Sequence, residues 1–314
     1  MLKNKNILSL RQRAKISKKP LLEHWQLYLL VLPMVLYLIL FCYKPLYGIL
    51  IAFKDYKIRM GVWGSPWVGF ENFERLFNSY WFPIILKNTL VVSALSLFLG
   101  FPLPIILALM VNEIRSGKIR KTFQIVSYAP HFVSMVVVCG MITMFLSPST
   151  GIINQIIVKL GGESYAFMQS ETAFKWIYTI SGFWQNTGWS SIIYIATLSA
   201  VDKSLHEAAE IDGANRFQRI IHINFPVLVP TMVIMLIMRV GQVMSVGFEK
   251  VFLLQTDTNL LGSEVISTYV YKQGLQGAQF SFSTAVGLFN SIVNTILLVS
   301  VNTIANKISG SGLW

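Results

Sequence analysis

Long apolar stretches separated by short polar segments dominate the chain. A helix needs about 20 mostly apolar residues to cross the hydrocarbon core of a bilayer, because each residue rises about 1.5 Å through a layer of about 30 Å. Six stretches meet this requirement, at residues 25–53, 84–111, 123–146, 177–200, 227–247 and 282–304. The pattern predicts an all-α membrane protein with six transmembrane helices.

The composition supports a membrane protein and excludes a soluble one. Of the 314 residues, 54% are hydrophobic and 13% are charged, and the mean hydropathy is +0.57. The net charge of +12 would suggest nucleic-acid binding in a soluble protein. Here the cations occupy short segments between apolar stretches, so we expect a lipid bilayer around the chain and no nucleic acid as a partner.

The positions of these cations predict the orientation. Fifteen of the 26 Lys and Arg residues lie on one side of a six-helix arrangement: seven in the first 24 residues, four at 115–121, three at 203–219, and Lys307. Because basic loops stay in the cytoplasm, both termini are predicted to be cytoplasmic. Residues 1–24 are predicted to form a basic cytoplasmic tail. Residues 25–314 then form a single transmembrane domain, whose first stretch is too long for a signal peptide.

Reactive chemistry is missing from the sequence. No GxxxxGK[ST] loop occurs, so the chain is not expected to hold nucleotide phosphates in the P-loop manner. His206 and Glu207 resemble the start of a zinc-binding HExxH motif, but Glu210 stands where the second histidine is needed. Cys42 and Cys139 lack the spacing of a metal site or a disulfide framework. We therefore expect no catalytic residue, no metal site and no cofactor bound by this chain.

The loop at residues 201–226 is the most informative segment. It holds the densest acidic cluster of a basic chain, made of Asp202, Glu207, Glu210 and Asp212. Ser204, followed three residues later by Glu207, predicts a capped helix over 204–212, and Gly213 predicts a turn after it. Apolar residues at helical spacing from Phe217 to Phe225 predict a second short helix along the membrane face. The alternative is a solvated loop that only connects two spans.

The same loop resembles a known signature. Glu207-Ala208-Ala209, then Gly213 after three residues and Ile223-Asn224-Phe225-Pro226 after nine more, resembles the EAA signature EAA-x3-G-x9-I-x-L-P. That signature is typical of inner-membrane permeases of ATP-binding-cassette (ABC) importers, and Phe225 in place of leucine is the one departure. The segments NEIRSGKIRKTFQIVSYAPHFVS, EAAEIDGANRFQRIIHINFP, GFEKVFLL and SGLW look like those of polysaccharide and complex-oligosaccharide permeases, so the resemblance covers nearly the whole chain.

This resemblance implies a fold and a set of partners. The fold would be that of a type I ABC importer permease, with a cytoplasmic coupling helix between helices 4 and 5. The chain would form half of the path for an oligosaccharide or polysaccharide and would pair with a second related permease in a heterodimer. Two ATPase subunits would bind ATP and Mg, and an extracytoplasmic solute-binding protein would deliver the saccharide. The complex would lie in the bacterial cytoplasmic membrane.

The resemblance also assigns roles within the loop. Glu207 would pair with a basic group of the ATPase, Ala208 and Ala209 would let the ATPase approach closely, and Gly213 would set the bend. The implied ATPase-coupling residues are Glu207, Ala208, Ala209, Gly213, Ile223 and Pro226.

Polar and tryptophan residues in or near the predicted spans are candidates for the substrate path, because polar groups in lipid are costly unless they face a cavity or another helix. They are Trp184, Gln185, Asn186, Trp189, Arg239, Gln242, Glu249, Asn290 and Asn294. Indole rings can stack on sugars, and amides can bond to their hydroxyls. As alternatives, the asparagines could link helices, the tryptophans could pack against lipid or protein, and Arg239 could pair with another subunit.

Two other classes of function compete with an importer permease. A secondary transporter or channel for a small polar solute would couple through buried carboxylates or a filter, and the predicted spans hold almost no Asp or Glu. A membrane-embedded enzyme would need the reactive cluster that the sequence lacks. The sequence therefore favours the importer permease.

Overall fold

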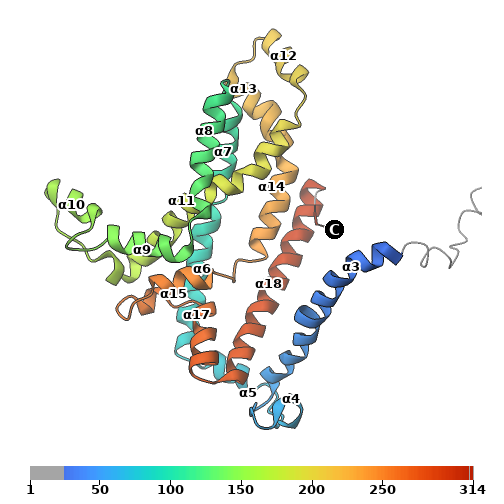
Figure 1. Ribbon diagram of the computed structural model, residues 1–314, viewed down its shortest axis with the longest axis vertical. Coiled ribbons are helices and arrows are strands. Elements are labelled where there is room, and N and C mark those ends of the chain that lie inside the picture. The colour runs from blue at the N-terminus through green and yellow to red at the C-terminus, as the bar shows by residue number, and fades with distance from the viewer. Residues whose placement is uncertain (1–24, 311, 314) are drawn as a thin grey trace, which may run out of the picture. The chain divides into compact units, whose positions relative to one another are not determined.

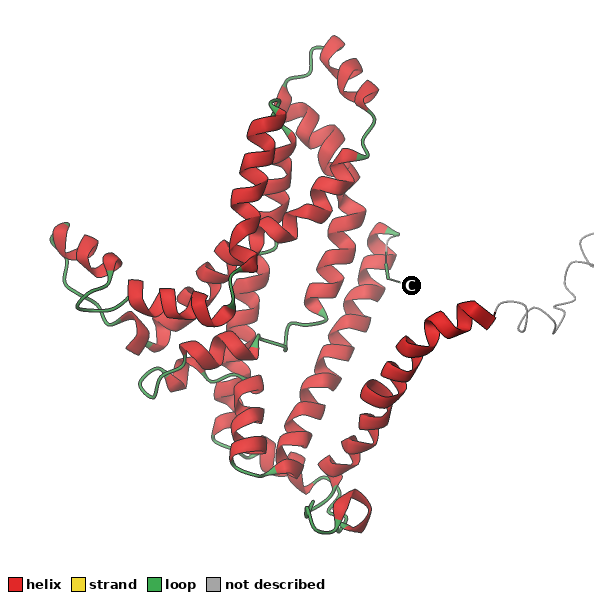
Figure 2. Cartoon of the chain, in the orientation of Figure 1, coloured by secondary structure: helices red, strands yellow, loops and turns green. Residues whose placement is uncertain are grey.

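The computed structural model describes residues 25–310, 312 and 313. The chain divides into two compact units, residues 1–50 and 51–314, and the predicted basic tail at 1–24 lies outside the described residues. Each regular element in the described part is helical, as Figure 2 shows. The one extended pairing there is an isolated antiparallel bridge between Lys54 and Trp67. The predicted all-α class is thus confirmed for the described residues.

The described part of the first unit is one long apolar helical run. It begins with α3 (Trp25–Tyr37), continues as the π-helix η2 (Leu38–Tyr43) and ends in the 3-10 helix η3 (Lys44–Phe53), whose last residues belong to the second unit. This run has a mean hydropathy of 2.1 over its most apolar part, and no residue of that part is buried. An apolar helix without a buried face is suited to contact with lipid.

Three further helical runs are long and apolar enough to cross a membrane. They are Trp81–Asn112, Arg216–Val240 and Phe280–Ile308. The first comprises α6 (Trp81–Phe98) and α7 (Pro102–Asn112), the second comprises α13 (Arg216–Arg219), the π-helix η6 (Ile220–Asn224) and α14 (Phe225–Val240), and the third lies in α18 (Phe280–Ser309). With residues 25–53, the described chain has four such runs, or five if a bent pair is one span.

The bent pair is the predicted span at 123–146. Here α8 (Gly117–Tyr128) and the 3-10 turn η4 (Ala129–Phe132) meet α9 (Met135–Phe145) at 95°. Pro130 has no backbone N–H to continue the helix, and Val133 is extended. Ser134 then caps α9, because its side chain accepts a hydrogen bond from the Val137 N–H at 3.4 Å. The sequence pattern alone did not show this bend.

The predicted fourth span corresponds to α11 (Glu171–Ser199), which runs through the centre of the second unit. It packs against α7, α8 and α14, and the polar residues Thr179, Gln185 and Ser191 are buried along it. Gly188 allows the crossing with α8, since a Cβ there would lie 2.0 Å from the Ser127 carbonyl oxygen. α11 is not among the helices apolar enough to count as spans by composition.

The helix that corresponds to the predicted fifth span begins and ends earlier in the chain than the predicted range 227–247. The helical run begins at Arg216 and ends at Val240, residues 241–244 form a turn, and residues 245–247 are irregular. The second short helix predicted for 217–225 is therefore wrong as a separate element, because it continues into α14. Pro226 lies inside this run, as the second residue of α14 and just after η6, so its missing N–H falls where the hydrogen-bond pattern changes from π-helix to α-helix.

The remaining elements of the second unit are short. They are α4 (Gly61–Gly64), α5 (Glu71–Phe77), α10 (Ile152–Lys159), η5 (Phe167–Gln169), α12 (Lys203–Ile211), α15 (Phe248–Leu254), α16 (Leu260–Ser263), α17 (Ile266–Tyr271) and η7 (Lys272–Gln276). In Figure 1, α12 lies at one end of this unit, and α5 lies at the other. Apolar clusters join α5, α6, α17 and α18, then α6, α9, α11 and α15, and then α7, α11 and α14. Because α11 belongs to two of these clusters, it connects the α12 end to the middle of the unit.

Candidate functional site

The acidic loop begins with a helix cap at Asp202. Its side chain accepts a hydrogen bond from the Ser204 N–H at 3.0 Å, and this bond lowers the pKa of the carboxyl below its ordinary value. A charged carboxylate at this end also matches the positive pole of the helix dipole. The predicted cap at Ser204 is therefore wrong, because Ser204 lies within the first turn of α12.

The predicted turn at Gly213 is confirmed. Gly213 adopts φ +79°, in the left-handed region that favours glycine. Its N–H donates to the Glu210 carbonyl at 3.1 Å, and the Ala214 N–H donates to the Ala209 carbonyl at 2.8 Å. This pair of bonds is a Schellman motif, which satisfies the last carbonyls of α12 and stops the helix.

The chain after the turn is held by side-chain contacts. Asn215 and Gln218 form a reciprocal capping box, with Asn215 Oδ1 accepting from the Gln218 N–H at 2.9 Å and Gln218 Oε1 accepting from the Asn215 N–H at 2.8 Å. Arg219 pairs with Glu210 across the turn, and this hydrogen-bonded pair lowers the pKa of Glu210. The loop therefore has a defined shape with a bend at Gly213.

The outer face of α12 is available to another molecule. Glu207 and Ala208 are exposed, and Ala209 is half-buried. Glu207 forms no ion pair within the described residues. Beside this face is a groove of about 310 Å³, lined by Ala209, Asp212, Gly213, Ala214, Gln218, Arg219, His222 and Ile223. Pro226, the last residue of the signature, is exposed at the start of α14.

A second candidate site lies among α6, α9, α11, α14 and α15. Two adjoining cavities, of about 510 Å³ and about 440 Å³, share the lining residues Ser96, Tyr178, Asn186, Arg239 and Gly247. We call the two together the polar cavity. Its volume and its mixture of polar and aromatic side chains suit a small polar ligand.

The structure brings five of the predicted path residues to this cavity. They are Gln185, Asn186, Arg239, Gln242 and Glu249. Gln185 is buried and donates to the Val133 carbonyl at 3.2 Å, and its own carbonyl oxygen has no partner in the described residues. Asn186 faces the His131 ring, with 3.1 Å between Oδ1 and Nδ1. These amides leave acceptors and donors for a ligand.

The other four predicted path residues do not line the polar cavity. Trp184 lies in a separate apolar groove of about 610 Å³ with Trp176 and Ile180. Trp189 stacks on His131, with ring centroids 4.6 Å apart.

Two of these four are asparagines of α18. Asn294 accepts from the Met244 N–H at 3.0 Å and donates to Ser245 Oγ at 2.9 Å. It therefore supports the turn after α14, and Ser245 in turn lines the cavity. Asn290 lines neither cavity, and its carbonyl oxygen is buried without a partner in the described residues.

Sequence reasoning missed Lys250 and Tyr178, which both line the polar cavity. Lys250 is 5% exposed. Its Nζ donates to the Tyr178 carbonyl at 2.9 Å and lies 4.8 Å from the centroid of the Tyr178 ring. Lys250 stands in the apolar segment GFEKVFLL. Arg239 was selected because a charged group among apolar residues is costly unless it faces a cavity or another helix, and the same rule would have selected Lys250. Tyr178 gave no such signal.

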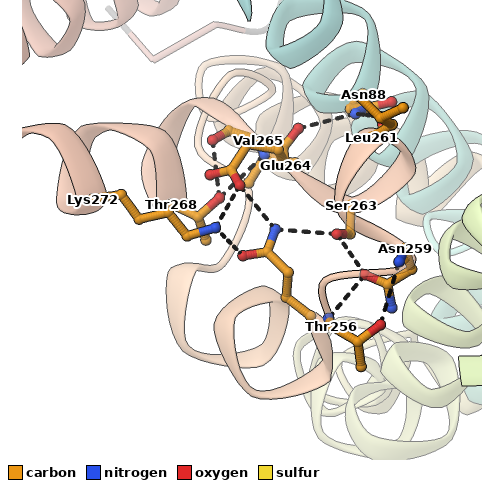
Figure 3. A network of polar contacts seen from close by, with 10 residues as sticks. Asn88, Thr256, Asn259, Leu261, Ser263, Glu264, Val265, Thr268 and Lys272 are labelled. Carbon is orange, nitrogen blue, oxygen red and sulfur yellow. Dashed lines mark hydrogen bonds and ion pairs between the residues drawn. The ribbon is translucent and has the colours of Figure 1, made fainter. Parts of the chain in front are cut away.

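A polar network fixes the segment that follows Lys250 (Figure 3). Glu264, with its side chain 3% exposed, accepts from Lys272 Nζ at 2.6 Å and from Gln255 Nε2 at 3.2 Å. Asn88 of α6 donates to the Glu264 carbonyl at 3.0 Å, and Asn259 donates to the Met168 carbonyl at 2.8 Å. The network joins the segment that runs from α15 through α17 to α6 and to Met168, which are two distant parts of the chain. It thereby positions one wall of the polar cavity.

Known proteins resemble this chain along most of its length. Residues 100–310 match the family model described as "Binding-protein-dependent transport system inner membrane component". The polygalacturonan/rhamnogalacturonan transport system permease protein YteP of Bacillus subtilis (strain 168) is 43% identical over 97% of this chain and 95% of its own. Protein LplB of the same organism is 41% identical over 93% of this chain and 92% of its own.

A solved structure agrees with these relatives. A chain of a bacterial ABC transporter involved in the import of the acidic polysaccharide alginate shares 40% sequence identity with this protein, with a TM-score of 0.86 over 93% of this chain and 98% of its own. A chain of the bacterial alginate ABC transporter in complex with an alginate pentasaccharide-bound periplasmic protein matches with a TM-score of 0.87 and 40% identity, over 94% of this chain and 99% of its own. The fold is therefore that of an ABC importer permease. This protein belongs to the binding-protein-dependent transport system inner membrane components, and it is a permease subunit of an ABC transporter rather than an enzyme.

Proposed function

We propose that this permease forms half of the path by which an oligosaccharide or polysaccharide enters a bacterial cell. The observation that carries the proposal is the polar cavity, which lies among helices of an ABC importer permease fold. The names of two relatives refer to polygalacturonan, rhamnogalacturonan and alginate, so the cargo proposed here is a saccharide. Gln185, Asn186 and Gln242 supply amides for its hydroxyls.

The proposed topology has six crossings of the cytoplasmic membrane within one domain, residues 25–314. In addition to the four apolar runs, the bent pair of α8 and α9 would be the third crossing and α11 the fourth. α11 tolerates polar residues because protein buries them. The cations at 115–121 and 203–219 favour a cytoplasmic position for α12 and for both termini.

The proposed partners rest on the similarity to importer permeases and on the exposed face of α12. A second related permease would complete the path, and an extracytoplasmic binding protein would deliver the saccharide. Two ATPase subunits would hold ATP and Mg, and each would receive one coupling helix. Glu207 would pair with a cation of the ATPase, while Ala208 and Ala209 leave room for a close approach.

The connections of α12 to α11 and α14 would carry its movement to the polar cavity. α12 follows α11 after a short link and is joined through the Gly213 bend and the Glu210–Arg219 pair to α13 and α14. α11 and α14 carry Gln185, Asn186 and Arg239 into the cavity. Closure of the ATPase dimer would therefore displace both helices together. The polar cavity would then close on one side of the membrane and open on the other.

Charge reversal at Glu207 tests the coupling. We expect Glu207→Arg to abolish binding-protein-stimulated ATP hydrolysis and saccharide uptake by the complete importer in proteoliposomes, because a cation would then face the cation of the ATPase. Lys118→Glu is the matched control, since it reverses an exposed charge at the start of α8 that forms no ion pair within the described chain. Unchanged coupling in Glu207→Arg would contradict the proposed role of α12.

A further inference from the structure

The charges of the polar cavity do not balance. Its charged lining residues are Arg239, Glu249 and Lys250, so its formal charge is +1. Neither cation forms an ion pair within the residues that the structure describes. Glu249 is exposed, whereas Lys250 is buried and Arg239 is half-buried. The two cations are therefore not paired with a carboxylate of the described residues.

Such cations are costly without an anion. Lys250 has one carbonyl oxygen and one aromatic ring as partners, and both offer only partial negative charge. Arg239 stands in the last turn of α14, within an apolar run of 25 residues. The carbonyls at the end of α14 stabilise its charge in part. A cation in an apolar setting normally pairs with an anion, and one that does not marks a functional site.

The cavity also holds an unused acceptor. Gln185 is 4% exposed, and its carbonyl oxygen has no hydrogen-bond partner among the described residues. Because this oxygen is itself buried, a ligand hydroxyl can donate to it only when the amide turns toward the cavity. The same cavity therefore combines a site for a hydroxyl with two cations that lack an anion.

We propose that Arg239 and Lys250 form a carboxylate-binding site in the translocation path, so that the permease itself selects anionic saccharides that contain uronic acid residues. This inference rests on the proposed function. The guanidinium of Arg239 matches the two oxygens of a carboxylate, and Lys250 adds a point charge from α15. Glu249 keeps the net charge at +1, so the site attracts one carboxylate without holding an anionic chain too tightly to release it.

The test uses the complete importer in proteoliposomes with its binding protein. Uptake is measured for trigalacturonate and trimannuronate and for the neutral trisaccharides made by reducing their carboxyl groups. We expect Arg239→Gln and Lys250→Met to lower uptake of the uronates about 10- to 100-fold, the loss that follows from removing a hydrogen bond to a charged group. Uptake of the neutral forms should fall much less than uptake of the uronates, and Arg239→Lys should restore part of the uronate uptake.

Lys87→Gln is the control, because Lys87 is an exposed cation of α6 outside the cavity. The uptake by each variant is divided by the uptake of the same trisaccharide by the wild-type importer. The preference of the binding protein for one trisaccharide over another then does not affect the result. Equal losses for charged and neutral trisaccharides, or unchanged uronate uptake in Arg239→Gln, would overturn the carboxylate site and leave a structural or subunit-pairing role. Wild-type import of neutral saccharides only would also overturn it while leaving the proposed function intact. A wild-type importer that no saccharide-loaded binding protein stimulates would overturn the proposed function itself.

Discussion

The coupling loop at 201–226 and the polar cavity are built in opposite ways. Each hydrogen bond or ion pair that shapes the loop joins residues close in sequence, from Asp202 with Ser204 to Glu210 with Arg219, nine residues apart. The cavity is closed by contacts between distant segments. Lys250 bonds to Tyr178, 72 residues away, and Ser93 bonds to the carbonyl of Val243, 150 residues away.

This difference predicts how each region responds to substitution. A local motif keeps its form as long as its own residues are kept, so changes there should alter the loop and leave the rest of the permease folded. The cavity wall depends on the packing of the whole unit, so changes there should lower global stability as well as transport. Substitutions in the two regions can therefore separate coupling from folding.

The largest effect is expected at the network beside the cavity. Lys272→Met would leave the Glu264 carboxylate, with its side chain 3% exposed, without its cation. Breaking a buried ion pair from one side costs about 3–5 kcal/mol, and the value here should lie at the lower end because the Lys272 side chain is 29% exposed. Thermal unfolding of the purified complex measures this loss.

The double variant Lys272→Met with Glu264→Leu is the matched control. Replacing both partners with apolar residues removes the uncompensated charge, so most of the lost stability should return. A double variant as unstable as Lys272→Met alone would show that the network acts through its hydrogen bonds to Gln255 rather than through the ion pair. In either case the destabilisation should extend beyond the loop at 255–276.

The same distinction explains what the sequence could predict. The turn at Gly213, the helix over most of 204–212 and the all-α class depend on local patterns, and the structure confirms them. The cap was misplaced by two residues because Asp202 and Ser204 are both good capping residues, and only the backbone shows which one lies before the first turn.

Other features depend on tertiary structure and could not be derived from the pattern. The 95° bend between α8 and α9 occurs within a continuous apolar stretch. Gln185 and Trp184 are neighbours in sequence, yet they face the polar cavity and an apolar groove respectively. Lining the cavity is a property of the face of α11, and a list of polar residues does not determine which face turns inward.

A smaller effect is expected at the bend of the loop. Gly213→Ala would place a Cβ in the left-handed region, which costs about 1–2 kcal/mol, although no atom lies within 4 Å of the added Cβ. Uptake and binding-protein-stimulated ATP hydrolysis should fall, while the unfolding temperature of the complex stays close to the wild-type value. Both assays on the same proteoliposome preparation check this separation.

Two variants make the result at Gly213 specific. Gly117→Ala is the matched control, because a Cβ there also meets no atom within 4 Å and Gly117 does not adopt a left-handed φ, so it should leave transport unchanged. Gly213→Asn should retain more activity than Gly213→Ala, since asparagine tolerates the left-handed region. If alanine and asparagine behaved alike at Gly213, the backbone geometry would not be what matters for coupling.

The smallest effect is expected at the helix caps. Asn215→Ala removes one half of the capping box and should cost about 1 kcal/mol of local stability. Asp202→Ala should act in the same direction on α12, while Ser204→Ala should have a smaller effect, because the backbone N–H of Ser204 still donates to Asp202. Hydrogen exchange of the backbone amides at 203–219 in the intact complex measures these local changes.

The pKa of Asp202 determines how the stability of α12 depends on pH. Its pKa is lowered in the folded loop by the hydrogen bond from the Ser204 N–H, so the cap stabilises α12 fully above the ordinary carboxyl pKa. That stabilisation is lost as the pH falls through the lowered value. At neutral pH the wild-type cap is therefore complete, and Asp202→Ala should speed exchange in α12 without lowering the unfolding temperature of the complex. Faster exchange in Ser204→Ala, equal to that in Asp202→Ala, would mean that the serine hydroxyl caps the helix and that the sequence pattern had placed the cap correctly.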